Sequence, residues 1–264
     1  MKSLTRREFI QTTAAATALG AAGCTNMSST TPASPSVYEL RMYSINPGKT
    51  QALHDRFRNH TLKLFKRHSI ESIGYWMPLD DKNQTLHFLL RSPSREARET
   101  SWKAFVADPE WQAAYKASEA NGGLVSKVEN PFFVLTDYSP HVRTGNVSKG
   151  GVFEFRQYTT PAGLLPNLDA RFRDHTLKLF AKHGMGNWAY FHRMADQTDA
   201  AVRLEYFLYH KSKEAADASF KAFREDPAWV AARKASEEKA GGSLTIPNGV
   251  KSTFLAATDF SPTK

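Results

Sequence analysis

Hydrophobic and polar residues alternate along "VYELRMYSI" (37–45), a stretch rich in aromatic and branched side chains. This alternation predicts a β-strand. The polar segment "NPGKT" follows and supplies a turn, because proline and glycine favour one. From about 50 to 68 the apolar residues change to helical spacing, as at Leu53, Phe57 and Leu64, which predicts an amphipathic helix.

Further predicted elements follow in a fixed order. Two strands are expected at 71–78 and 84–91, separated by the polar turn "LDDKN". A helix spanning 94–118 should break at Asp108 and Pro109, because proline ends one helical piece and favours the start of the next. The segment "NPFFVLTDY" predicts a closing strand. The resulting order, βαββαβ, is that of ferredoxin-like folds.

The same pattern occurs twice in the chain. "RFRNHTLKLFKRH" (56–68) and "RFRDHTLKLFAKH" (171–183) lie 115 positions apart, and after a three-residue insertion the match continues at an offset of 118. Self-similarity at a fixed offset indicates repeated structural units. We therefore predict a first half at 37–140 and a second half at 152–262, joined by a polar linker at 141–151.

The duplication suggests how the two units pack. A four-stranded sheet that helices cover on one face leaves its other face bare, and two such sheets can bury these faces against each other. The sequence therefore predicts an α+β fold in which two ferredoxin-like βαββαβ repeats pack as an intramolecular dimeric α+β barrel.

At this level the chain resembles the NIPSNAP family, which falls in the dimeric α+β barrel superfamily. The likeness is carried by the strand openings "VYELRMY" and "VFEFRQY", the helix segments "RNHTLKLFKRH" and "RDHTLKLFAKH", "GYW" (74–76), and the turns "ADPEW" and "EDPAW". It covers nearly all of the chain from 37 to 262. Two positions depart from the pattern: Ser69, which is Gly184 in the second half, and Ala189, which is Gly74 in the first.

The composition is that of a globular protein, with 41% hydrophobic and 23% charged residues. The formal net charge of +9 would attract anionic surfaces or ligands. Basic and acidic residues are interleaved, however, and do not form a basic stripe next to exposed aromatic residues. We therefore expect a solubilising surface and no nucleic-acid partner.

Residues 1–23 are predicted to be an export leader that lies outside the fold. Arg6 and Arg7 precede Phe9 and Ile10, and a run rich in alanine and glycine follows that is too short and too weakly hydrophobic to span a membrane. This arrangement resembles bacterial twin-arginine leaders. The resemblance implies export across the inner membrane in a folded state, and thus a periplasmic location.

The only cysteine of the chain, Cys24, follows "LGAAG", which resembles a lipoprotein cleavage box. A lipid on Cys24 would anchor the protein to the membrane through a flexible Ser/Thr/Pro tether at 24–36. Cleavage near Ala22 without lipidation is the alternative. A single cysteine excludes an internal disulfide and leaves no thiol in the two halves for catalysis or metal binding.

Histidines recur in register in the duplicated helix. At 3.6 residues per turn, His60 and His68 fall on the apolar stripe that faces the sheet, as do His175 and His183. Buried imidazoles need hydrogen-bond partners. Either they lock the helix to the sheet, or His60 or His175 serves as a ligand or proton-transfer group in a helix–sheet crevice. His60 and His68 lie roughly 12 Å apart along the helix axis, so we expect no metal site there.

The first strand of each half places charged and phenolic side chains on one face, because side chains alternate along a strand. The candidate binding residues are Glu39, Arg41, Tyr43, Tyr75 and His68 in the first half, and Glu154, Arg156, Tyr158, Tyr190 and His183 in the second. We expect the Glu-Arg-Tyr face to lie where the two sheets meet, with the apolar face against the helices. There it would form either an ion-pair network that fixes the docking of the halves or a polar cavity that captures a ligand.

Two further groups of residues are placed by their spacing. The aromatic residues of the second helices are expected to belong to a core or an interface: Trp102, Trp111, Phe220 and Trp229. Asp137 and Asp259 end the closing strands and have no evident partner in the sequence.

No phosphate-binding loop, nucleophile elbow, paired-cysteine site or zinc motif is present in the sequence. The NIPSNAP resemblance favours a cell-envelope protein that binds a small anionic or amphipathic ligand through Arg41 and Arg156, without a cofactor. Likeness to the superfamily leaves a second alternative, a cofactor-free or haem-dependent oxygenase. A third is a structural or protein-interaction module, and the outer helices leave room for an oligomer.

Overall fold

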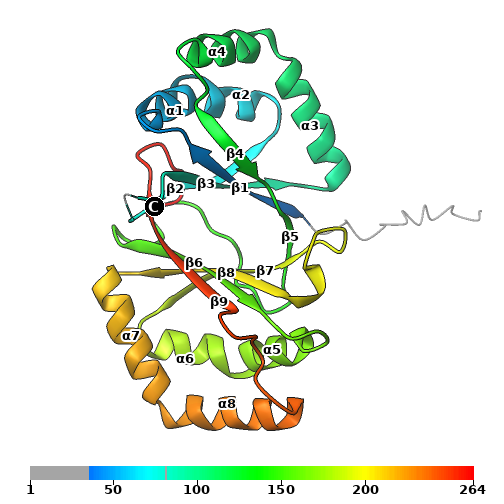
Figure 1. Ribbon diagram of the computed structural model, residues 1–264, viewed down its shortest axis with the longest axis vertical. Helices are drawn as coiled ribbons and strands as arrows, with labels where there is room; N and C mark the ends of the chain where they lie inside the picture. The colour runs from blue at the N-terminus through cyan, green and yellow to red at the C-terminus, as the bar shows by residue number, and fades with distance from the viewer. Residues whose placement is uncertain (1–35, 81) are drawn as a thin grey trace, which may run out of the picture. The chain divides into compact units, whose positions relative to one another are not determined.

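Eight strands close into an antiparallel barrel with the helices outside it (Figure 1), in a computed structural model that describes residues 36–80 and 82–264. The first half contains β1 (Val37–Ile45), α1 (Thr50–Arg56), η1 (Phe57–Thr61), α2 (Leu62–Arg67), β2 (Glu71–Pro78), β3 (Thr85–Ser92), α3 (Arg95–Ala107), α4 (Pro109–Glu119), β4 (Val125–Glu129) and β5 (Phe132–Leu135). The second half contains β6 (Val152–Thr159), α5 (Leu165–Arg171), η2 (Phe172–Thr176), α6 (Leu177–Lys182), β7 (Gly186–Arg193), η3 (Ala200–Val202), β8 (Arg203–His210), α7 (Lys213–Glu225), α8 (Pro227–Ala240) and β9 (Val250–Ala257).

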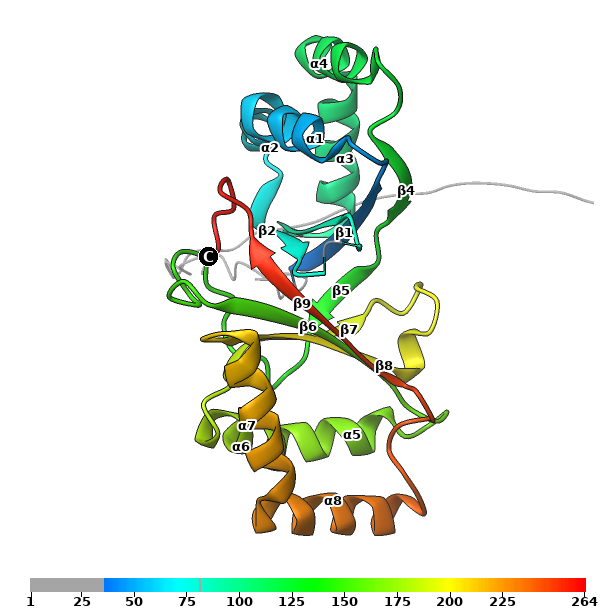
Figure 2. The ribbon, with the colours of Figure 1, turned by 60° about the vertical axis from the view of Figure 1, so that its left-hand side comes forward.

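The barrel closes because each half supplies a strand to the sheet of the other. The strand order is β3-β2-β9-β6-β8-β7-β5-β1, and β1 also pairs with β3 to complete the ring. β9 of the second half pairs with β2, and β5 of the first half pairs with β7 (Figure 2). The predicted α+β fold, an intramolecular dimeric α+β barrel, is confirmed. The predicted closing strand of the first half is found as β5, and a strand that was not predicted, β4, precedes it; both lie beside β1.

The inside of the barrel is an apolar core to which both halves contribute. It is formed by Tyr38, Leu40, Ile73, Trp76, Leu89, Phe133, Val142, Phe153, Phe155, Trp188, Ala189, Phe191, Phe207 and Leu255. Trp76 of one half and Trp188 of the other meet edge to face, with ring centroids 5.6 Å apart. The closed barrel excludes water from its interior, so apolar side chains fill this space.

The predicted orientation of the first strand is therefore wrong. Tyr38 and Leu40 point into the barrel, whereas Tyr43 packs in the core between sheet and helices. Arg41, on the same face as Tyr43, lies 4.2 Å from the ring centroid of Trp102 on α3. Both faces of β1 are buried. An arginine that is paired with a carboxylate can stack on the aromatic rings of the helix layer, whereas the apolar barrel interior offers its charge no partner.

Helix α3 and helix α4 meet at a break whose position was predicted. Ser94 caps α3 by accepting a hydrogen bond from the amide of Ala97. Asp108 ends α3 and caps α4, accepting from the amide of Glu110 at 2.8 Å, with Pro109 at the first helical position. Ser212 and Asp226 act in the same way in the second half.

The long first helix of each half contains a π-helical turn, η1 or η2, between two α-helical pieces. Its widened turn is marked by Thr61, whose hydroxyl donates to the carbonyl of Arg56 at 3.2 Å, and by the equivalent Thr176. One extra residue per turn rotates the buried face, so Thr61 and Thr176 are almost fully buried. The predicted sheet-facing position of His60 and His175 is therefore wrong: His60 is half-buried and His175 is exposed.

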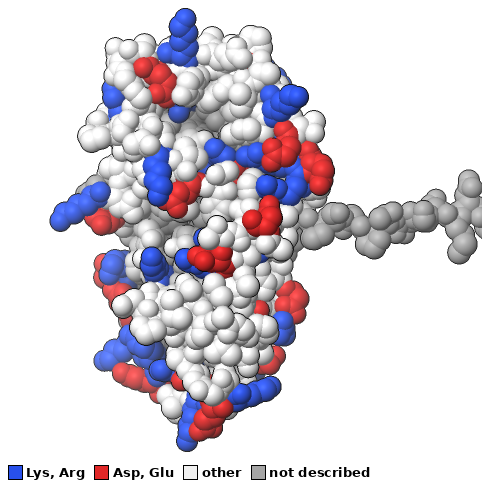
Figure 3. Space-filling view, turned by 45° about the vertical axis from the view of Figure 1, so that its right-hand side comes forward, with Lys and Arg blue, Asp and Glu red and all other residues white. Residues whose placement is uncertain are grey.

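Charges of both signs are mixed on the face drawn in Figure 3. Within 36–80 and 82–264, no helix combines the length and the hydropathy needed to span a bilayer. The predicted leader (1–23), Cys24 and all but the last residue of the predicted tether (24–36) lie outside the described residues.

Candidate functional site

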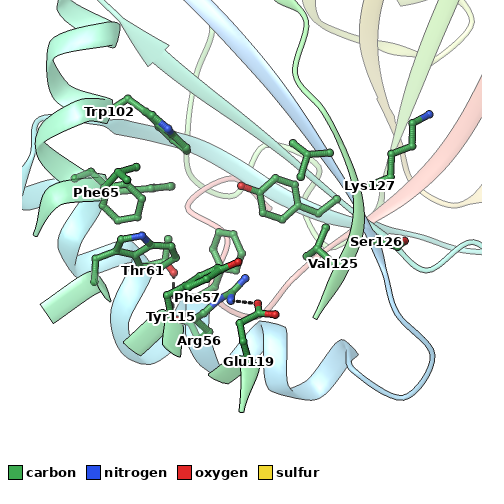
Figure 4. Close-up of a pocket in the computed structure, with 15 residues that line it drawn as sticks. Arg56, Phe57, Thr61, Phe65, Trp102, Tyr115, Glu119, Val125, Ser126 and Lys127 are labelled. Atoms are coloured by element: carbon green, nitrogen blue, oxygen red, sulfur yellow. Dashed lines mark hydrogen bonds and ion pairs between the residues drawn. The ribbon is translucent and has the colours of Figure 1, made fainter. Parts of the chain in front are cut away.

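Each half contains a cavity between its helices and the outer face of its sheet. The first cavity has a volume of about 240 Å³, and the second, at the equivalent place, about 270 Å³. In the first, Trp102 and Phe65 come from the helices and face Val125 of β4, while Arg56 and Glu119 meet at one end (Figure 4). The helices and strand β4 thus enclose the first cavity.

Arg56 is the buried cation of the first cavity. It ends α1 and is 5% exposed. Its Nη1 donates to Oε1 of Glu119 at 2.6 Å and to the hydroxyl of Ser118 at 3.1 Å. The guanidinium lies 5.6 Å from the ring centroid of Trp111 and 5.2 Å from that of Tyr115. A buried arginine that is paired and stacked in this way keeps its charge inside an aromatic wall.

Arg171 takes the place of Arg56 in the second cavity, and its side chain is 6% exposed. It lies 5.2 Å from the ring centroid of Trp229. Its contact with Glu237 is longer, at 3.6 Å, and neither Nε nor Nη1 has a hydrogen-bond partner. Burial lowers the pKa of Arg171 from its usual value, which Glu237 only partly offsets.

Arg156, one of the residues that the sequence predicts to bind a ligand, also lines the second cavity. Its Nη1 pairs with Glu154, its Nε donates to the phenol oxygen of Tyr206 at 3.0 Å, and its Nη2 donates to Tyr158 at 3.2 Å. Burial opposes its charge, but the phenol oxygens and Glu154 outweigh that effect and raise the pKa of Arg156. Arg156 is thus a permanent, fully partnered cation.

Glu39 and Arg41 form the equivalent network of the first half, under α3. Arg41 Nη1 and Glu39 Oε1 are 2.5 Å apart, and Arg98 of α3 donates two hydrogen bonds to Glu39, at 2.7 and 2.8 Å. In the second half Glu154 accepts instead from His210 Nε2 at 2.9 Å. The first network ties β1 to α3 and the second joins β6, β8 and β9, so neither lies between the halves.

The other tyrosines and histidines that the sequence suggested as binding residues have structural roles. Tyr75 and Tyr190 are buried on the helix side of the sheet and bond to Ser72 and Asn187. Burial raises the pKa of Tyr75 and of Tyr190. The cavities of 240 and 270 Å³ are lined by Tyr43 and Tyr158, but not by these two residues.

His68 and His183 hold helix junctions together. Each places Nε2 at 2.7 Å from Oδ2 of the aspartate that caps the last helix of its half, Asp108 or Asp226. His68 and then Arg67 keep the pKa of Asp108 well below its usual range. Neither these histidines nor His60 and His175 line the two cavities.

The sequence reasoning missed Arg56, Arg171 and the carboxylates Glu119 and Glu237. A signal was present, because Arg56 and Arg171 begin the duplicated thirteen-residue segments. Trp111 and the other aromatic residues of the second helices do pack against the helix–sheet cores, and they also form cavity walls. Asp137 and Asp259 do have partners, which are Arg173 and Arg58.

Among residues 36–80 and 82–264, no three histidine, cysteine or acidic side chains gather where they could hold a metal ion. Both cavities set buried cations in aromatic walls.

Residues 38–140 match the family model described as NIPSNAP. This stretch is a NIPSNAP domain. The chain is also 26% identical over 231 residues to the mouse protein named Protein NipSnap homolog 3B. The matched region covers 86% of this chain and 85% of the mouse protein.

Two solved structures resemble the whole barrel. One is a presumed monooxygenase from Lactobacillus acidophilus, with a TM-score of 0.55 and 11% identity, covering 87% of this chain and 97% of that chain. The other is an anthrone oxidase-like protein, with a TM-score of 0.53 and 14% identity, covering 88% of this chain and 95% of that chain. At this level of identity the likeness establishes the fold. The NIPSNAP domain thus belongs to a barrel whose architecture is shared with monooxygenase-like proteins.

Proposed function

We propose that this NIPSNAP-domain protein binds small anionic amphipathic molecules in the two cavities. The observation that carries the proposal is a buried arginine, Arg56 or Arg171, at an equivalent place in each aromatic cavity. An acidic group would pair with the guanidinium, and an apolar body would lie against the aromatic walls. Arg41, which the sequence favoured for this role, is paired with Glu39 and does not line the first cavity.

The rim of the first cavity supports an amphipathic ligand over a purely polar one. Val106, Tyr115 and Val128 line this cavity and are 46%, 48% and 45% exposed. Large apolar side chains gathered around one opening favour contact with an apolar chain. The tail of a bound ligand would leave the cavity across this rim.

The test is calorimetric titration of the purified protein with octanoate, a small acid with an apolar tail. We expect binding in the wild type and a loss of about tenfold or more in affinity in an Arg56→Met/Arg171→Met double variant, because each change removes a charged donor. Arg143→Met, an exposed change in the linker, is the matched control. Equal octanoate binding by all three proteins would refute the proposal.

Oxygenase chemistry is a second proposal, favoured by the likeness of the fold to the monooxygenase structure and to the anthrone oxidase-like structure. Native mass spectrometry of the protein purified from its own cells would identify any bound molecule. Incubating that molecule with the protein and dioxygen, and measuring whether oxygen is incorporated into it, tests the oxygenase proposal. No histidine, cysteine or methionine lines either cavity, so a haem there would have only tyrosines as axial ligands, Tyr43 or Tyr115 in the first and Tyr158 in the second.

We also propose that the chain acts in the cell envelope, on the basis of Arg6, Arg7 and Cys24 in the amino-terminal sequence. Metabolic labelling with a fatty acid should tag the wild type, and Cys24→Ser should abolish the label. Arg6→Lys/Arg7→Lys should keep the protein in the cytoplasmic fraction. An unlabelled wild type whose mature amino terminus precedes residue 24 would rule out the lipid anchor.

A further inference from the structure

The two cavities differ in charge although they occupy equivalent places. In the first, Arg56 has Glu119 as its own carboxylate, at 2.6 Å. In the second, the equivalent Glu237 is shared, because Arg233 Nε donates to its Oε1 at 3.1 Å while Arg171 Nη1 lies 3.6 Å from the same oxygen. One carboxylate thus serves two guanidinium groups in the second cavity.

A single exchange between the halves explains this sharing. Arg233 stands where the first half has Tyr115, 118 positions earlier. Tyr115 leaves Glu119 free to pair with Arg56, whereas Arg233 draws Glu237 away. Arg224, where the first half has Val106, adds another cation to the wall of the second cavity.

Arg171 is left with two buried nitrogen atoms, Nε and Nη1, that have no hydrogen-bond partner. Of the equivalent Arg56 in the first cavity, Nε alone is in this state. Buried donors without partners are costly, and an oxyanion placed among them would satisfy both the hydrogen bonds and the charge. The first cavity has no comparable excess of cations, since Arg56 is neutralised by Glu119 and Lys127 pairs with Glu129.

We propose that the acidic ligand binds selectively in the second cavity, with its carboxylate on Arg171, while the first cavity does not discriminate in favour of an anion. This inference rests on the proposed ligand-binding function and deepens it. The ligand class is an organic carboxylate with a short apolar body, which Trp229, Phe180 and Phe220 would contact.

Single variants of the full chain, titrated with octanoate, test the selectivity. Arg171→Met should weaken octanoate binding about tenfold or more, whereas Arg56→Met should change it less than about threefold. Arg233→Tyr, which installs the residue of the first half, should release Glu237 to Arg171 and weaken octanoate binding as well. Arg233 is 59% exposed, so this variant keeps the fold even if Arg171→Met does not.

The reciprocal variant and a neutral probe complete the design. Tyr115→Arg should strengthen octanoate binding in the first cavity, so that a second equivalent of ligand binds with comparable affinity. Octanol, which has no charge, should bind equally to the wild type and to Arg233→Tyr. Octanoate affinity unchanged in Arg233→Tyr, or equal losses from Arg56→Met and Arg171→Met, would overturn the selectivity and leave the binding function intact. A wild type that binds no octanoate would overturn the binding function itself.

Discussion

Arg58 of the first half and Asp259 of the second half form a two-point ion pair, with Nε and Nη2 each 2.9 Å from a carboxylate oxygen. Arg173 and Asp137 make the reciprocal pair, at 2.9 and 2.7 Å. The two aspartates follow the strands that each half supplies to the other. The ion pairs therefore fasten the exchanged strands to the opposite helix, at positions where solvent reaches all four side chains.

Removing both exposed pairs with Arg58→Ala/Arg173→Ala should lower the melting temperature only slightly, because solvent and salt screen such interactions. The difference from the wild type should shrink further in concentrated salt. Calorimetric melting at low and high ionic strength measures this. A large loss that persists in salt would mean that the pairs matter through packing and not through charge. Arg91→Ala, which removes the exposed pair with Glu71 inside one half, is the control.

Gly74 packs directly against Trp76, two residues along the same strand. A Cβ on Gly74 would overlap the indole ring of Trp76, and in the second half Phe191 replaces the tryptophan and Ala189 replaces the glycine. We expect Gly74→Ala to destabilise the protein by about 1–3 kcal/mol through overpacking. Adding Trp76→Phe should recover part of that loss, which urea unfolding of the single and double variants measures. Additive losses in the double variant would contradict this explanation of the departure from the family pattern.

Glu39 is a buried carboxylate that accepts from both Arg41 and Arg98. Its replacement in Glu39→Ala leaves the buried Arg41 guanidinium without its counter-charge, while Arg98 keeps Glu99, and should cost about 3–5 kcal/mol. Denaturant unfolding measures the loss. Glu71→Ala, at an exposed pair, is the matched control and should cost much less. Similar losses in both variants would show that the buried network contributes no more than a surface pair.

His87 should make the protein sensitive to mild acid. It is 5% exposed, and burial lowers its pKa to about 4 despite the nearby carbonyl of Thr85 and the carboxylate of Glu129. The folded state therefore holds this imidazole neutral while the unfolded chain protonates near pH 6.5, so stability is full above that pH and is lost as the pH falls towards 4. The loss should reach about 3 kcal/mol at most. Urea unfolding between pH 7 and pH 4.5 should show a shallower decline in His87→Gln than in the wild type. Parallel declines would exclude His87 as the sensitive group.

Much of the fold could be predicted because local signals agreed with one another. Alternation marked the strands, Asp108 and Pro109 marked the helix break, and the duplicated helix segment showed that a second sheet was available in the same chain. What alternation could not decide was the direction of β1, because both of its faces are buried. The expectation that charged residues mark the junction of the sheets failed since Arg41 is paired with Glu39 and stacked on Trp102.

The candidate site was harder to predict, for two physical reasons. A helical wheel assumes a constant rotation per residue, and the π-helical turns η1 and η2 break that assumption between Arg56 and Thr61. The distinctive charge of the second cavity also depends on a difference between the halves, Arg233 against Tyr115, whereas a search for repeats selects what the halves share.

Because β5 and β9 each pair with a strand of the other half, neither half of the chain is complete without the other. A fragment that carries only one half would lack the strand that covers its β2 or β7 edge, and its own last strand would keep β1 or β6 on one side but have a bare second edge. Such a fragment is expected to pair with a second copy of itself, because unpaired strand edges seek strands. Two fragments produced together from a cut within 141–151 should instead recombine into a single barrel.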